Sequence, residues 1–198
     1  MSISARAPRV MAVGDEILES FDDMLRRVEF RYGMEKIKVV AIEDIPQVTI
    51  SFSETKPIKF GPFPKEAAFT VPVWLMRVLK SKGYVVVHRD EKTDEMLQPA
   101  SDKNLVPLPG FFYNKTIDWL DTVERLTGKG MVSDQMGKRL RSRFLSFFDV
   151  RLKQILNSLS LPLSTLMKSL TQEEQVIIRH VHALLDAWEK SVFKREAS

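Results

Sequence analysis

Residues 60–87 read FGPFPKEAAFTVPVWLMRVLKSKGYVVV, and this stretch predicts a short helix held between two strands. A glycine and two prolines within its first five residues indicate a turn, and an extended piece through Phe69 and Val71 follows. We expect Pro72 at the first position of the helix, because its missing N–H would have no intrahelical partner there.

The helix predicted after Pro72 carries apolar side chains at helical spacing, and we assign Trp74, Leu75, Val78 and Leu79 to one apolar face. Lysines in its last turn and a glycine directly after it indicate the helix end. Residues 84–87 then read as a buried strand. The stretch therefore predicts a small β-rich module with no reactive side chain.

Upstream, the sequence predicts no regular secondary structure over residues 1–13, and then one helix and two strands. Residues 15–31 place apolar side chains along one side, acids in the first turn and arginines near the end, as the helix dipole favours. Residues 36–42 and 47–52 are rich in β-branched residues and are bounded by turn-forming ones, so we expect two strands. Residues 89–104 are polar and aperiodic, which indicates a linker.

Beyond the linker, every long segment is helical in pattern. Apolar spacing predicts a helix over 112–126, a long helix capped by Ser133, a short helix that opens at Pro162, and a last helix that begins at a T-x-x-E capping box formed by Thr171 and Glu174. The expected fold is α+β and mostly α. An N-terminal helix and a small β-rich domain occupy residues 1–88, a linker 89–108, and a helical bundle 109–198.

The bulk composition indicates a folded chain and excludes some chemistry. The 198 residues are 44% hydrophobic and 28% charged, and none is cysteine, so disulfides, zinc–thiolate sites and cysteine nucleophiles are excluded. No apolar run approaches the roughly 20 residues needed to cross a bilayer, so we expect no membrane contact. Arg6 and Arg9 have no apolar run after them, so a signal peptide is not expected.

The sequence offers little material for catalysis. His180 and His182 are two residues apart on one predicted helix and point in nearly opposite directions, so they cannot share a metal ion. His88 has no histidine near it, and no nucleophile elbow, zinc-protease or phosphate-loop motif occurs. We therefore expect no enzymatic activity, no cofactor and no metal.

The net charge of +4 is concentrated in one helix. Residues 129–153 hold seven basic residues against two acidic ones, a net charge of +5 (7 − 2). The helical projection spreads most of the cations along both flanks of an apolar stripe and places Arg151 inside it. This arrangement favours a subunit interface over a DNA-reading face. A DNA- or RNA-binding regulator that uses this helix stays open, with Lys138, Arg139 and Arg141 as its contacts.

The helical region also carries more large apolar side chains than a small bundle easily buries, and a permanent oligomer would account for them. The residues expected at a partner interface are Phe111, Phe112, Trp119, Phe144, Phe147, Phe148, Arg143 and Arg151.

Two motifs resemble those of a known family. The passage from Gly61 to Leu75 resembles the β-domain signature of GINS subunits, in which a G-P-F-like turn precedes a V/L-P-L-W-L-A helix start, and Phe111, Phe112 and Trp119 resemble the helix that opens the family's α-domain. The signature residues here are Gly61, Pro62, Phe63, Val71, Pro72, Trp74 and Leu75. Val73 and Met76 replace the usual leucine and alanine, and the helix before the β-domain is a further departure from close relatives.

The order of the domains identifies the chain as similar to the β-domain-first class of GINS subunits, most closely the archaeal one. That resemblance implies a non-enzymatic scaffold at the replication fork, in a heterotetramer with an α-first sibling. Its implied partners are the MCM helicase, a RecJ-like protein and also primase or polymerase, with DNA contacted only weakly or indirectly. The implied location is the archaeal cytoplasm at the nucleoid, or the nucleus in a eukaryote.

Overall fold

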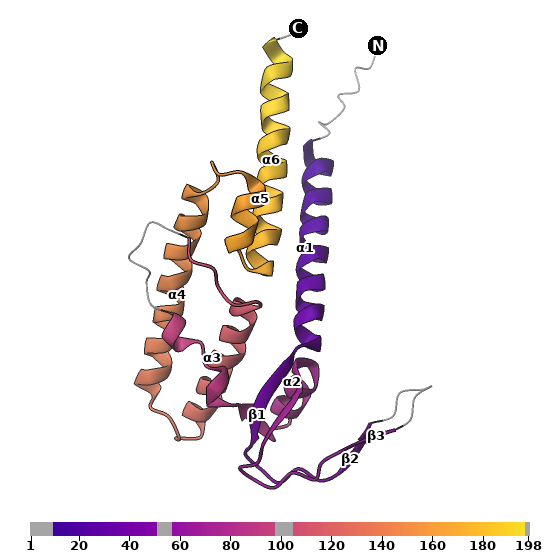
Figure 1. Ribbon diagram of the computed structural model, residues 1–198, viewed down its shortest axis with the longest axis vertical. Helices are drawn as coiled ribbons and strands as arrows, with labels where there is room; N and C mark the ends of the chain where they lie inside the picture. The colour runs from indigo at the N-terminus through magenta and orange to yellow at the C-terminus, as the bar shows by residue number, and fades with distance from the viewer. Residues whose placement is uncertain (1–9, 51–56, 98–104, 197–198) are drawn as a thin grey trace, which may run out of the picture.

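A computed structural model describes residues 10–50, 57–97 and 105–196 of the chain (Figure 1). The elements are, in order, α1 (Val10–Met34), β1 (Lys36–Ala41), β2 (Val48–Ile50), β3 (Ile58–Phe60), β4 (Ala68–Pro72), α2 (Val73–Ser81), β5 (Val85–Val87), the short 3-10 helices η1 (Arg89–Glu91) and η2 (Asp94–Met96), α3 (Phe112–Gly128), α4 (Asp134–Asn157), α5 (Leu163–Leu166), η3 (Met167–Ser169) and α6 (Gln172–Glu196). The expected fold class, a β-containing N-terminal region followed by helices, is confirmed.

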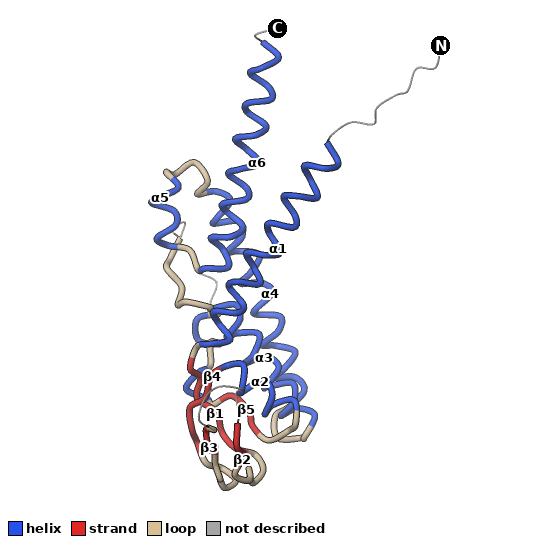
Figure 2. Tube along the Cα trace, turned by 90° about the vertical axis from the view of Figure 1, so that its right-hand side faces the viewer, coloured by secondary structure: helices blue, strands red, loops and turns tan. Residues whose placement is uncertain are grey.

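The N-terminal region is built around one antiparallel sheet in the order β4-β1-β5. Val39 of β1 lies between Phe69 of β4 and Val87 of β5. α2 packs against all three strands, and α1 packs against α2 (Figure 2). A second pair, β2 and β3, forms a separate two-stranded ribbon that points away from the helices in Figure 1. The sequence did not predict β3, and residues 51 and 52 of the expected second strand lie outside the described residues.

Two local expectations are corrected. Pro72 is the last residue of β4 and stands just before the first helical residue, because its backbone is still extended (ψ 146°) and paired with Lys36. The buried side of α2 consists of Val73, Leu75, Met76, Leu79 and Lys80, whereas Trp74 and Val78 are 37% and 50% exposed. The apolar residues extend around most of this short helix, so spacing alone could not tell which of them meet the sheet.

The C-terminal region follows the predicted helices closely. The Ser133 hydroxyl accepts a hydrogen bond from the Met136 amide at 3.3 Å, which confirms it as the cap of α4. The capping box of α6 is also confirmed, since the Glu174 carboxylate accepts from the Thr171 amide at 2.9 Å and the Thr171 hydroxyl accepts from the Glu174 amide at 3.2 Å. The first helix is longer than predicted and begins at Val10 rather than Asp15.

The two regions share one core rather than standing apart on a tether. α1 packs along α6, and a single buried cluster joins residues of α1, α2 and the sheet to Phe111 and Val176 of the helical region. The first part of the expected linker is packed as well, because Leu97 is only 1% exposed and the Thr93 hydroxyl lies 2.9 Å from that of Thr116 on α3. Residues 98–104 of the expected linker lie outside the described part.

Candidate protein-interaction site

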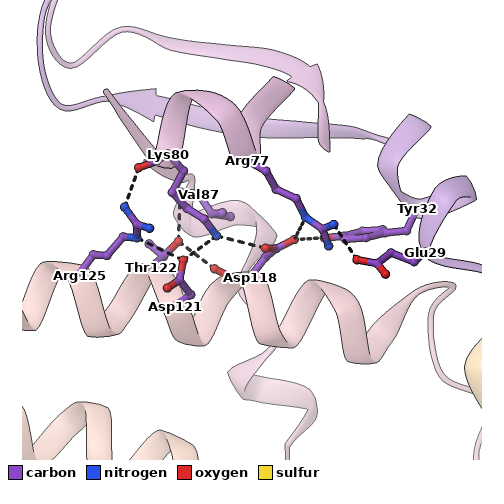
Figure 3. Close-up of polar contacts among 9 residues, drawn as sticks. All are labelled: Glu29, Tyr32, Arg77, Lys80, Val87, Asp118, Asp121, Thr122 and Arg125. Atoms are coloured by element: carbon purple, nitrogen blue, oxygen red, sulfur yellow. Dashed lines mark hydrogen bonds and ion pairs between the residues drawn. The ribbon is translucent and has the colours of Figure 1, made fainter. Parts of the chain in front are cut away.

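The junction between α2 and α3 is a buried polar network (Figure 3). Lys80 on α2 places its ammonium 3.1 Å from the Asp118 carboxylate and 2.8 Å from that of Asp121, both on α3. Tyr32 on α1 donates its hydroxyl to the other oxygen of Asp118 at 2.8 Å. Arg125 donates to the backbone carbonyl of Lys80 at 2.6 Å, so α3 meets α2 through side chain and backbone alike.

This network holds the β-containing region at a fixed position on α3. The Lys80 and Asp118 side chains are 7% and 8% exposed, and two opposite charges removed from water must compensate each other to avoid a large desolvation cost. Burial, followed by the neighbouring Asp118 carboxylate, raises the pKa of the Tyr32 phenol well above its ordinary value. Tyr32 is therefore a neutral donor to Asp118 at any physiological pH.

A second buried network joins α4 to the start of α6. Arg151 donates to both carboxylate oxygens of Glu174, at 2.8 and 3.0 Å, and to the backbone carbonyls of Val106 and Ser169. The Tyr113 hydroxyl donates to the same carboxylate at 2.7 Å. The Arg151 and Glu174 side chains are only 3% and 2% exposed. Each buried charge is compensated by the opposite charge of its partner and by these hydrogen bonds.

An apolar groove opens beside this second network, between α3, α4 and the first turns of α6. Its volume is about 350 Å³, and it is lined by Tyr113, Ile117, Phe144, Leu145, Phe148, Leu152, Ile155, Glu173, Glu174 and Ile177. The exposed fractions of Ile117, Leu145, Phe148 and Leu152 are 54%, 56%, 40% and 37%. We call these four side chains the groove residues.

The spacing of the groove residues on α4 makes a stripe suited to another helix. Leu145, Phe148 and Leu152 recur at intervals of three and four residues, and Leu156, which is 48% exposed, continues the row. The inner side of the same helix is already filled, because Leu140, Phe147 and Ile155 are buried against the rest of the chain. Among the described residues, α4 therefore carries a buried apolar row and, beside it, a second apolar row that is left largely exposed.

The eight residues expected at a partner interface differ in their exposure to solvent: four are buried inside the chain and four are half-buried or exposed. Phe111, Phe112, Phe147 and Arg151 are buried within the chain's own core at 7%, 0%, 7% and 3% exposure, so they are removed from the expected interface. Trp119 and Phe144 are half-buried, and Phe148 is exposed in the groove. Arg143 lies half-buried on α4.

Sequence reasoning missed three of the four groove residues, Ile117, Leu145 and Leu152. The spacing of Leu145 and Leu152 relative to Phe148 was visible in the sequence. However, apolar residues buried inside the chain and apolar residues exposed on its surface can have the same helical spacing. Only the three-dimensional arrangement separates the two stripes of α4.

The expected nucleic-acid contacts are exposed but partly neutralised. Lys138 forms an ion pair with Asp134 at 2.6 Å, and Arg141 forms one with Glu124 at 3.2 Å. Arg139 is exposed on the same helix. Since two of the three cations already face a carboxylate, the positive field of this surface is weaker than the sequence suggested.

The signature residues occupy structural positions. Gly61 has a φ of +82°, and a Cβ there would lie 3.1 Å from the Pro46 carbonyl, so this turn requires glycine. The bond from Gly61 to Pro62 is cis, and the Phe63 ring stacks on Phe69 with centroids 4.0 Å apart. Val71 and Leu75 belong to the core, whereas Trp74 is partly exposed.

The helices and charged groups of the described residues have two further properties. None of the helices within residues 10–50, 57–97 and 105–196 combines the length and apolarity needed to cross a bilayer. The same residues bring together no group of three or more histidine and carboxylate side chains able to hold a metal ion. No protein-family model matches this sequence, and no curated protein matches it either.

Proposed function

We propose that this chain is a non-enzymatic GINS-type subunit, a scaffold that binds a sibling helical subunit through the groove residues and links the MCM helicase to a RecJ-like protein at the replication fork. The observation that carries the proposal is the second apolar stripe of α4. A helix with an uncovered row of leucine and phenylalanine beside a groove is suited to packing against a helix of another chain.

The rigid junction described above supports a scaffold role. A protein that positions other proteins needs fixed angles between its parts, and the Lys80–Asp118 network fixes the β-containing region against α3. The order of the regions and the turn at Gly61 support the resemblance to the β-first class. In this role the chain would act in the archaeal cytoplasm at the nucleoid, or in a eukaryotic nucleus, and contact DNA only weakly.

The test begins with affinity purification of the full-length chain from its native host, followed by mass spectrometry of the proteins that co-elute. We expect MCM subunits and an α-first GINS-type subunit. The sibling is then co-expressed with the chain, and multi-angle light scattering measures the mass of the assembly. A chain that stays monomeric in the presence of that sibling contradicts the proposal.

A matched pair of variants tests the groove itself. Phe148→Asp should abolish assembly with the sibling, because it places a charge where apolar side chains of the partner would be buried. Met136→Asp makes the same kind of change at an exposed methionine (54%) in the first turn of α4, away from the groove, and should leave assembly intact. Equal behaviour of the two variants would exclude the groove as the interface.

A further inference from the structure

The contact between α1 and the start of α6 contains a cleft with a cationic lining. α1 packs along α6 (Figure 1), and a cleft of about 190 Å³ opens where the last turns of α1 face the first turns of α6. Its apolar lining includes the buried Val28 and Val176, one from each helix. Three arginines also line it, Arg27 and Arg31 from α1 and Arg179 from α6.

The positive charge of this cleft is not compensated by the described part of the chain. No carboxylate within residues 10–50, 57–97 and 105–196 lines the cleft, so all of its charged lining residues are basic. The three arginine side chains are exposed, and across the same residues none of them forms an ion pair. Lys80 and Arg151 differ in this respect, because both pair with buried carboxylates.

The arrangement of the arginines carries an electrostatic cost. Arg27 and Arg31 stand one helical turn apart, and like charges at this spacing destabilise a helix slightly. Asp23 lies one turn before Arg27 and Glu35 directly follows α1, but neither forms an ion pair with these arginines in the part of the chain that the structure describes. With Arg179 on the facing helix, the cleft gathers three cations whose mutual repulsion a bound anion would relieve.

The size and charge of the cleft indicate the kind of anion. Pockets for whole small molecules usually measure about 300–1,000 Å³, so this smaller cleft suits one anionic group rather than a complete nucleotide. A phosphate monoester has a charge of about −1.5 to −2 at pH 7 and three acceptor oxygens, whereas a carboxylate has a single charge. Guanidinium groups bind phosphate oxygens through paired hydrogen bonds, which a lysine cannot form.

The sequence on either side of the arginine pair disfavours a nucleic acid strand. Such a strand carries its phosphates in a row, one charge on each. A row that continued along α1 beyond the cleft would approach Asp23 in one direction or Glu35 in the other. A single phosphate group between the two helices does not extend that far.

We propose that this cleft binds a phosphate monoester group, which Arg27, Arg31 and Arg179 hold between α1 and α6. A phosphorylated side chain of another protein and a small phosphorylated compound both carry this group, and the test separates these two sources. The site does not depend on the role proposed for the groove, because none of the groove residues lines it and its test uses the chain without a sibling subunit.

The probe is a blocked peptide, GSGSGSG, that is phosphorylated at its central serine and labelled with a neutral dye. The phosphate is then the only charged group of the peptide. The full-length chain is titrated into it, and fluorescence anisotropy reports binding. We expect a saturable rise with the phosphorylated peptide and none with the unphosphorylated one. Replacing the phosphoserine with glutamate should weaken binding at least several-fold, because a carboxylate has less charge and fewer acceptor oxygens.

Substitution of the arginines tests the assignment of the site. The Arg27→Gln, Arg31→Gln, Arg179→Gln triple variant should weaken binding of the phosphorylated peptide about tenfold or more. The three side chains are exposed and repel one another, so the triple variant should fold as well as the unaltered chain. Arg179→Lys keeps the charge but not the paired hydrogen bonds, and it should weaken binding several-fold.

A charge-matched control separates the cleft from general attraction. The Arg26→Gln, Lys59→Gln, Lys190→Gln triple variant removes the same number of exposed cations, none of which lines the cleft, and should bind the peptide as the unaltered chain does. Inorganic phosphate then serves as the competitor. Displacement at concentrations close to the Kd of the peptide assigns the site to a small phosphate compound, and displacement only at much higher concentrations assigns it to a phosphorylated protein.

Three results would overturn the proposal: equal binding of the unphosphorylated peptide, equal binding by the variant that lacks all three arginines of the cleft, or an equal loss in the charge-matched control. More effective displacement by a dodecamer of thymidylate with free hydroxyl ends than by inorganic phosphate would assign the cleft to nucleic acid and would also overturn it. Thermal unfolding followed by circular dichroism confirms that each variant is folded, and Arg179→Lys carries the test if the triple variant is not.

Discussion

The ammonium group of Lys80 lies 3.1 Å from the carboxylate of Asp118, and both side chains are almost completely removed from solvent. Lys80 belongs to the region around the sheet and Asp118 to the first helix of the bundle, so this pair crosses the boundary that the sequence predicted between two domains. Tyr32 completes the site by donating to the same carboxylate. The angle between the two regions is therefore set by buried charge as well as by apolar contact.

Asp118→Asn should destabilise the folded chain by about 3 kcal/mol, because it removes one of the two carboxylates that compensate the buried ammonium of Lys80. Asp121 still faces that ammonium, so the cost should lie at the low end of the range for a broken buried pair. Urea unfolding measures the change. The Lys80→Met, Asp118→Leu double variant should cost less than Asp118→Asn, and a loss below about 1 kcal/mol in the single variant would contradict this account.

Arg151→Met should cost roughly 3–5 kcal/mol, because it leaves the buried Glu174 carboxylate with only neutral donors. Thr171→Ala is the matched change, since it removes only the cap on the same turn and should cost about 1 kcal/mol. Thermal or urea unfolding of both variants gives the comparison. Similar losses would mean that Arg151 contributes no more than a helix cap.

Lowering the pH should destabilise the contact between α2 and α3, because the Asp121 carboxylate becomes protonated. Burial raises the pKa of its carboxyl, but hydrogen bonds and attraction from Lys80 and Arg125 outweigh burial and hold the pKa below the ordinary value. A depressed pKa contributes stability that is present at neutral pH and is lost as the pH falls below roughly 4. The Asp121→Asn variant should lose less stability than the unaltered chain between pH 5 and pH 3, as followed by urea midpoints, and equal slopes would refute the assignment.

Gly61→Ala should be destabilising, because the new Cβ would meet the Pro46 carbonyl at 3.1 Å and the backbone there has a φ of +82°. We expect a loss of at least about 1 kcal/mol in urea unfolding. Gly33→Ala is the matched control, since it lies within α1 and its Cβ would meet nothing within 4 Å. That change should be neutral or stabilising by up to about 1 kcal/mol.

DNA binding through the basic helix should be weak. Because Lys138 and Arg141 already face carboxylates, we expect a duplex to bind with a shallow salt dependence, equivalent to about two neutralised phosphates or fewer. Fluorescence anisotropy between low and physiological salt measures the slope. Tight binding with a steep slope, lost on charge reversal of Lys138 and Arg141, would favour the nucleic-acid alternative.

Helix positions and caps were predictable because their signals are local. Ser133 and the Thr171–Glu174 box lie within one turn of the groups that they bind, so three or four residues of sequence are enough to identify them. β3 escaped prediction because a strand of three residues has almost no periodicity, and its partner β2 is just as short. The place of Pro72 at the end of β4 and the exposed position of Trp74 depend on the sheet rather than on neighbouring residues.

The candidate surfaces were much less predictable. Phe111, Phe112 and Phe147 were expected to face a partner because an aromatic side chain has the same periodicity whether it packs inside or outside. The groove needed residues from α3, α4 and α6 to meet at one place, and no spacing in the chain relates Ile117 to Leu145. Arg151 could be placed in an apolar stripe, but its partner Glu174 lies on another helix.

The antiparallel arrangement of α1 and α6 has a practical consequence for handling the molecule. The start of α1 and the end of α6 lie toward the same end of the molecule, opposite the β2–β3 ribbon (Figure 1). A fluorophore or fusion partner attached near either end would sit far from the sheet. Surface-immobilised or dye-labelled preparations can therefore report on contacts made by the strands without obstructing them.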